Sequence, residues 1–183
     1  NETSAGIYVQ GCDDYQTLTS INGAPIYYPN HLLGLYSTFI APHFTTMTIE
    51  QSEHRGTMEN RIGGLINVET QHKQPDRFGL EGNVGIISSD LTLTIPCGKK
   101  SALWLSGRAS YINLLYGKWL KIDNVDVGYK FWDTNLTYAL HPTENDEIVV
   151  SGFFSRDNIQ VADSSNFSVG IHWHNIVGSA YWN

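Results

Sequence analysis

The stretch Ser101–Tyr111, SALWLSGRASY, alternates between two kinds of side chain along its whole length. One set is apolar or small and consists of Leu103, Leu105, Gly107, Ala109 and Tyr111. The other set is more polar and consists of Ala102, Trp104, Ser106, Arg108 and Ser110. Successive side chains of a β-strand point to opposite faces of a sheet. The period of two therefore predicts a strand with one apolar face and one polar face.

Five other segments of the second half of the chain share this period. Their apolar sets are Phe78, Leu80, Gly82, Val84 and Ile86; Leu91, Leu93 and Ile95; Trp132, Leu136, Tyr138 and Leu140; Ile148, Val150 and Phe154; and Val169, Ile171, Trp173, Val177 and Tyr181. Short polar turns at 97–100 and 141–146 and a longer connection at 117–126 join some of them. Two architectures fit: an outer-membrane barrel with the apolar face on lipid, or a soluble barrel or sandwich with that face inside.

Composition narrows the class of protein. The 183 residues are 41% hydrophobic and 12% aromatic, with ten Tyr and five Trp, which favours a mainly β chain of one or two compact units. A net charge of -7 without a basic stripe argues against a nucleic-acid partner. Cys12 and Cys97 show no spacing typical of a zinc site, and their pairing stays open. We predict no cofactor.

The first seventy residues have shorter segments and denser turns. Asn22-Gly23 between two apolar runs predicts a hairpin over 16–28, and the apolar spacing after Pro29 predicts a short helix capped by Asn30. The segments MTIEQS and LINVET are expected to be strands, the second entered through Gly63-Gly64. The polar, proline-containing stretch 71–77 is typical of a linker. We therefore expect three parts: 1–70, the linker 71–77, and the alternating strands of 78–183.

Several phrases resemble a known family in the order of the chain. The run GIYVQGCDDYQTLTSINGAPIYYPNHLLGLYSTF at 6–39 resembles the plug of Bacteroidetes TonB-dependent outer-membrane receptors of the SusC-like type, and ENRIGGLINVET at 59–70 is similar to the end of that plug. The run GNVGIISSDLTLTIPCGKKSALWLSGRASYINLL at 82–115 resembles the start of their barrel. The resemblance implies a small α+β plug segment at 1–70, followed by antiparallel strands of a large and here incomplete outer-membrane barrel.

The resemblance also implies a function and its partners. Such receptors import nutrients, as oligosaccharide, peptide or metal chelate, across the outer membrane of a Gram-negative bacterium and are not enzymes. The implied partners are membrane lipid, the nutrient, a TonB-type energy-coupling protein that binds a segment preceding this one, and a surface SusD-like lipoprotein. The plug motif corresponds to Gly11, Asn22, Gly23, Pro25, Gly63 and Gly64. The residues alone leave open a soluble β-domain that binds carbohydrate or protein.

A few side chains are candidates for binding. Tyr27, Tyr28 and His31 follow the hairpin and are expected to stack on a planar ligand such as a sugar. Arg108 lies on a polar strand face and is expected to pair with a carboxylate of the plug. His172 and His174 share one strand face, but two imidazoles do not make a metal site. The sequence shows no nucleophile and base in a catalytic pattern, so we predict neither catalysis nor a metal centre.

Overall fold

The computed structural model describes residues 16–50, 63–116, 121–122, 125–163 and 167–183. The described chain is mainly β and its sheets are largely antiparallel, as the alternating segments predict. Its one α-helix, α1 (Ile112–Tyr116), is short. No helix in the described part is long and apolar enough to cross a membrane.

Residues 16–70, which we call the N-terminal unit, contain a four-stranded sheet of order β2-β1-β6-β5. Its strands are β1 (Thr17–Ile21), β2 (Ala24–Ile26), β5 (Phe44–Glu50) and β6 (Gly64–Thr70). β1 pairs parallel to β6 and antiparallel to β2. The predicted hairpin is confirmed, because Asn22 and Gly23 make the turn at φ 48° and 80°.

The glycine pair Gly63-Gly64 leads into β6 as expected. Gly64 begins the strand at φ 132°, a backbone conformation that side chains with a Cβ rarely adopt. The amide of Gly63 donates to the carbonyl of Gln16 at 2.9 Å, so the pair joins the start of β6 to the start of β1. Both glycines are buried. Gly11 lies outside the described residues.

The predicted helix after Pro29 is wrong. The chain instead forms β3 (Asn30–His31), a 3-10 turn at Leu32–Gly34, β4 (Tyr36–Ser37) and a second 3-10 turn at Ala41–His43. Leu32 and Leu33 have φ of 51° and 56°, which a right-handed α-helix cannot contain. Asn30 is therefore a residue of β3 and caps nothing.

The second half forms one large sheet of order β13-β12-β11-β9-β8-β7, with β10 (Lys121–Ile122) paired to β11. Its strands are β7 (Gly79–Val84), β8 (Ser88–Pro96), β9 (Ser101–Ser110), β11 (Val125–Leu140), β12 (Ile148–Asp163) and β13 (Ser168–Trp182). Every neighbouring pair is antiparallel. β7 and β13 are the two edges of the described sheet, and residues 71–78, which contain no strand, connect it to the N-terminal unit.

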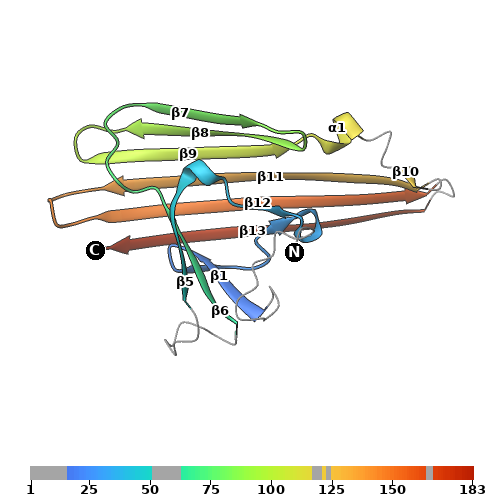
Figure 1. Cartoon of the computed structure of the whole chain (residues 1–183), viewed down its shortest axis with the longest axis horizontal. Helices are drawn as coiled ribbons and strands as arrows, with labels where there is room; N and C mark the ends of the chain where they lie inside the picture. The colour runs from blue at the N-terminus through green and yellow to red at the C-terminus, as the bar shows by residue number, and fades with distance from the viewer. Residues whose placement is uncertain (1–15, 51–62, 117–120, 123–124, 164–166) are drawn as a thin grey trace.

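The N-terminal unit lies against one face of the large sheet and extends beyond the β13 edge (Figure 1). Small apolar clusters join the two parts. In one of them Ile21 and Ile26 of the hairpin pack with Phe153 of β12 and Val177 of β13. The remaining contacts between the two parts are largely polar, and they define the candidate site below.

The alternating pattern assigns the strand faces correctly in β8, β9 and β11. On β11, Asp133, Asn135 and Thr137 turn toward the N-terminal unit and are at most 1% exposed, whereas Trp132 and Leu136 on the other face are 43% exposed. Arg108, Ser106 and Thr92 of the neighbouring strands face the same way as Asp133 and are also buried. The buried polar side chains of these three strands thus lie on the covered face, beside apolar ones such as Trp104 and Phe131.

The expected face of the sixth segment is wrong. Trp173, Val177 and Tyr181 of β13 pair with buried positions of β12 and pack on the clusters beneath the N-terminal unit. His172 and His174, which the barrel resemblance implies on the lumen face, point away from the N-terminal unit and are exposed. β13 carries large apolar side chains on both faces, including Ile176 and Trp182, so its pattern does not distinguish them.

Candidate functional site

A buried group of charges, which we call the central cluster, joins the N-terminal unit to the large sheet. It consists of His31, Arg108, Asp133 and Asp157, together with Tyr129, whose hydroxyl donates to Asp157 Oδ1. The His31 ring lies between two carboxylates: Nε2 is 2.8 Å from Asp133 Oδ1, and Nδ1 is 2.9 Å from Asp157 Oδ1. All three side chains are at most 1% exposed.

Register explains why these carboxylates meet. Asp133 lies opposite Arg108 of β9 and Asp157 lies opposite Phe131 of β11, and all face the N-terminal unit. The His31 ring stacks on Phe131, with centroids 4.1 Å apart. The short β3–β4 pair holds His31 in this position through its antiparallel contact with Tyr36.

Arg108 contacts both parts of the molecule. Its Nε donates to Asp133 Oδ2 at 2.7 Å, and its Nη2 donates to the carbonyl of Ser37 at 2.8 Å. The guanidinium also lies 5.0 Å from the centre of the Tyr36 ring, within the range of a cation–π contact. The prediction that Arg108 pairs with a carboxylate of the plug is wrong, because its carboxylate partner is Asp133 of the same sheet. Arg108 contacts the N-terminal unit through the Ser37 carbonyl and the Tyr36 ring.

Burial and charge act on His31 in opposite directions. Desolvation alone would lower the pKa of His31, but its hydrogen bonds to Asp133 and Asp157 and the charge of both carboxylates outweigh it and raise the pKa above 6.5. A protonated His31 donates from both ring nitrogens. With Arg108, it then balances the two carboxylates, so the cluster is neutral as a whole.

A second buried histidine anchors the N-terminal unit without charge. His43 Nδ1 lies 2.7 Å from Ser106 Oγ and Nε2 lies 2.9 Å from Thr137 Oγ1. Burial, with no carboxylate beside the ring, lowers the pKa of His43 to about 4. His43 is therefore neutral where His31 is charged.

The hairpin turn supplies a third polar contact. The Asn22 amide donates to Thr70 Oγ1 at 2.9 Å and to Ser151 Oγ at 3.0 Å, and it accepts the backbone N–H of Thr70. The turn residue thus connects the end of β6 to β12. Gly23 donates its N–H to Asn67 Oδ1, which closes the hairpin onto β6.

The three residues expected to bind a ligand, Tyr27, Tyr28 and His31, lie in different environments. His31 is fully buried between two carboxylates, so the expectation that it touches a ligand is wrong. Tyr27 and Tyr28 are 64% and 44% exposed and line an open hollow of about 380 Å³ with Leu33, Trp173, His174 and Asn175 at the β13 edge. Tyr28 meets the Trp173 ring edge to face at 5.9 Å. Pro25 lies in β2 and does not line this hollow.

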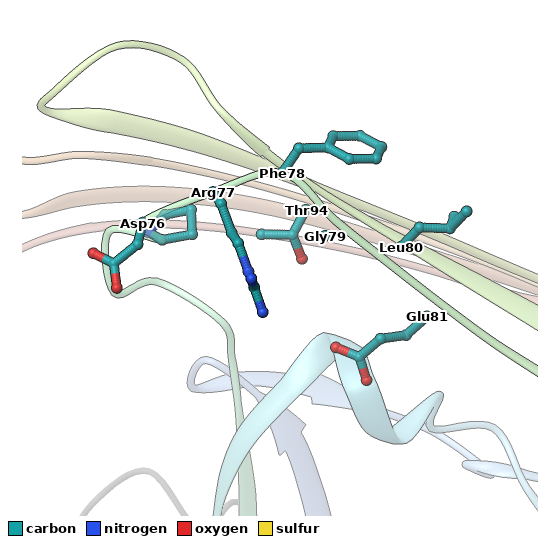
Figure 2. Close-up of a pocket in the computed structure, with 8 residues that line it drawn as sticks. Asp76, Arg77, Phe78, Gly79, Leu80, Glu81 and Thr94 are labelled. Carbon is teal, nitrogen blue, oxygen red and sulfur yellow. The ribbon is translucent and has the colours of Figure 1, made fainter.

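A larger hollow of about 650 Å³ lies at the opposite edge of the sheet, where the linker enters β7. Figure 2 shows the Arg77 side chain extending between those of Asp76 and Glu81. These three side chains are exposed. We interpret the hollow as a solvated edge, since no buried polar group converges on it.

The described residues include no group of three or more His, Cys, Asp or Glu side chains placed to hold a metal ion. Cys97 is exposed and has a free thiol, and Cys12 lies outside the described residues. No family model matches the sequence, and no curated protein matches it.

Sequence reasoning did not identify the central cluster. Alternation with Trp132 and Leu136 predicts a polar strand face for Asp133, but its partners His31 and Arg108 are 102 and 25 residues away in the chain. The sequence does carry one signal for this ion pair. Asp133 and Arg108 are each the single charged residue on the polar face of their strand, and a buried charge requires a partner. The cluster has the chemistry of an attachment, with every charged group paired.

Proposed function

We propose that this chain is part of an outer-membrane TonB-dependent receptor, in which the N-terminal unit belongs to the plug and the large sheet to the barrel wall. One observation carries the proposal. The face of the large sheet that the N-terminal unit covers buries many polar and charged side chains, beside apolar ones such as Trp104 and Phe131, whereas the other face exposes large apolar side chains. In a soluble protein, an antiparallel sheet with one covered face usually buries its apolar face and exposes its polar face to water.

The exposed apolar face is extensive. Besides Trp132 and Leu136, it includes one exposed side chain from each of six strands: Leu80, Leu91, Leu105, Tyr138, Val150 and Ile176. A continuous apolar surface on a soluble monomer costs free energy, whereas hydrocarbon solvates it. The alternation of lipid-facing and lumen-facing residues is the pattern of a transmembrane barrel strand.

The polar face fits the same proposal. A lumen is lined by polar and charged side chains, and a plug inside it must satisfy those groups with groups of its own. The N-terminal unit does this through His31, His43 and Asn22, each of which bonds to the large sheet. The proposed activity is energised nutrient uptake, with a TonB-type coupling protein and a SusD-like lipoprotein as proposed partners.

The test is a comparison of neighbouring positions on β11 in lipid vesicles. Nitroxide labels are placed at Asn135→Cys, Leu136→Cys, Thr137→Cys and Tyr138→Cys, each in a chain that also carries Cys12→Ser and Cys97→Ser. Collision with oxygen, which concentrates in hydrocarbon, is compared with collision with a water-soluble nickel chelate. We expect oxygen to reach 136 and 138 while the chelate does not, and neither reagent to reach 135 and 137.

The same labels test the alternative. If the chain is a soluble β-domain that binds carbohydrate or protein, it disperses as a monomer without detergent, and the chelate collides freely at 136 and 138. That result would overturn the receptor proposal. A planar sugar placed at the hollow formed by Tyr27 and Tyr28 would then be the binding reaction to measure.

A further inference from the structure

The outward face of the large sheet changes character at the end that carries α1 and β10 (Figure 1). In the register of β11, β12 and β13, Trp132 lies beside Arg156 and Arg156 beside His174. The next outward row consists of Lys130, Asn158 and His172. Cations, imidazoles and an amide thus replace the mainly apolar side chains of the preceding rows, and we call these two rows the basic rim.

Ring stacking holds Trp132 and His174, which belong to the first row of the basic rim, against Phe154 of the preceding row. The Trp132 ring stacks on Phe154 with centroids 4.7 Å apart and planes 27° apart. The Phe154 ring in turn lies nearly parallel to His174, at 6.3 Å and 11°. These contacts form a stack of three rings on the outward face, with one ring from each of the adjacent strands β11, β12 and β13.

The two cations of the rim are available to a ligand. Lys130 and Arg156 are both exposed. Neither forms an ion pair with a carboxylate of the residues that the structure describes. Asp133 and Asp157 are their strand neighbours but point to the covered face, where His31 and Arg108 neutralise them. On the outward face, the nearest acidic residue of β11 is Asp126, two rows beyond Lys130.

The rim lies where a bilayer would end. The apolar stretch of β11 from Trp132 to Leu140 measures about 27 Å along the strand at about 3.4 Å per residue. With a strand tilt of about 40° it spans roughly 20 Å, near the apolar height of about 25 Å in outer-membrane barrels. The opposite end differs, because there Trp182 donates to Asp146 and Lys100 donates to the carbonyl of Pro142.

We propose that the basic rim binds the anionic, phosphate-bearing headgroups of membrane lipid. The inference rests on the proposed function, since it requires the outward face to contact a bilayer. A guanidinium donates two parallel hydrogen bonds to a phosphate, and an ammonium adds a point charge. An indole at the boundary between hydrocarbon and headgroup suits both environments.

The test measures lipid binding by the full chain in neutral detergent. Native mass spectrometry gives the apparent dissociation constant of the first bound phosphatidylglycerol, and phosphatidylcholine serves as the neutral comparison. The variant is Lys130→Gln with Arg156→Gln. The control is Lys99→Gln with Lys100→Gln, which removes the same charge at the opposite end of the sheet.

We expect the rim variant to bind phosphatidylglycerol about 25-fold more weakly, since each cation near a lipid surface contributes about a fivefold preference. Binding of phosphatidylcholine should not change, and the control should bind both lipids as the unaltered chain does. Equal binding of phosphatidylglycerol by the rim variant would overturn the inference. So would an equal loss in the control, because it would indicate a response to total charge.

A spin-label measurement distinguishes failure of the receptor proposal from failure of the headgroup-binding proposal. In vesicles of phosphatidylcholine alone, the label at Leu136→Cys reports whether the outward face meets hydrocarbon at all. Exposure of that label to the nickel chelate overturns both proposals. A lipid-facing label together with unchanged binding by the rim variant overturns only the headgroup site.

Discussion

Replacing Asp133 with Asn should loosen the attachment of the N-terminal unit to the large sheet. Asp133 is the only carboxylate within the central cluster that contacts both His31 and Arg108. The substitution keeps the size of the side chain and one acceptor but removes its charge. Arg108, which is 6% exposed, then keeps the Ser37 carbonyl and two aromatic rings as partners but no carboxylate.

The magnitude follows from the burial of the cluster. Removing one member of a buried ion pair costs about 3–5 kcal/mol. His31 limits the cost, because without Asp133 its pKa falls back and loss of its proton restores neutrality. We therefore expect about 3 kcal/mol, which corresponds to a roughly 150-fold larger fraction of detached molecules.

Hydrogen exchange measured by mass spectrometry follows this fraction. Peptides that cover β3, β4 and β6 should exchange about 150-fold faster in Asp133→Asn if exchange requires detachment. Asp76→Asn is the matched control, since Asp76 is exposed on the linker and should leave exchange unchanged. The peptides from β12 serve as an internal reference.

The pH dependence separates the cluster from a general defect. A histidine with a raised pKa stabilises the attached state fully below 6.5 and loses that contribution as pH rises through its raised pKa. The difference between the unaltered chain and Asp133→Asn should therefore be largest below pH 6.5 and shrink above the raised pKa of His31. A difference that stays constant with pH, or that equals the effect of Asp76→Asn, would refute the reasoning.

Two further predictions concern the other polar contacts. Because burial lowers the pKa of His43 to about 4, the attached state should lose up to roughly 3 kcal/mol as pH falls from 6.5 toward 4. His43→Gln should flatten this acid dependence of hydrogen exchange in β5 and β6, and an unchanged slope would exclude His43 as its source. Asn22→Ala should cost about 2–3 kcal/mol in urea unfolding, since it removes the bonds to Thr70 and Ser151 and strains a turn at φ 48°. Asn22→Gly keeps the turn and should cost about 1 kcal/mol less; equal costs would show that backbone strain is not involved.

Periodicity made the large sheet predictable but not all of its faces. On β9 and on β11 from Trp132 to Leu140, alternation separates the two faces, and the structure follows it. On β13 both faces carry aromatic or aliphatic side chains, so the sequence offers no contrast. There the packing of Ile21 and Ile26 on Val177 decides the orientation. Such contacts between distant segments are not visible in a local pattern.

The candidate site was predictable only in its parts. The turn at Asn22-Gly23 followed from local backbone chemistry, because both residues tolerate positive φ. The role of His31 did not follow from local sequence, because the residues around it are equally compatible with an exposed histidine and with one buried between two carboxylates. The left-handed backbone at Leu32 and Leu33 was also hidden, because apolar spacing predicts a helix there. Tertiary contacts with β9, β11 and β12 supply what the sequence lacks.

The composition of the interface bears on how it opens. An apolar interface loses free energy in proportion to the area that water wets, whereas a polar pair exchanges its partner for water at a small net cost. His31, His43 and Asn22 each lie in such pairs, and apolar clusters around Phe131 and Phe153 accompany them. A single broken pair is costly while the interface stays dry. Once water enters, each remaining pair is solvated in turn. The interface therefore specifies one docked position strongly and yet resists detachment less than an apolar interface of equal area, a combination that the proposed role as a displaceable plug would require.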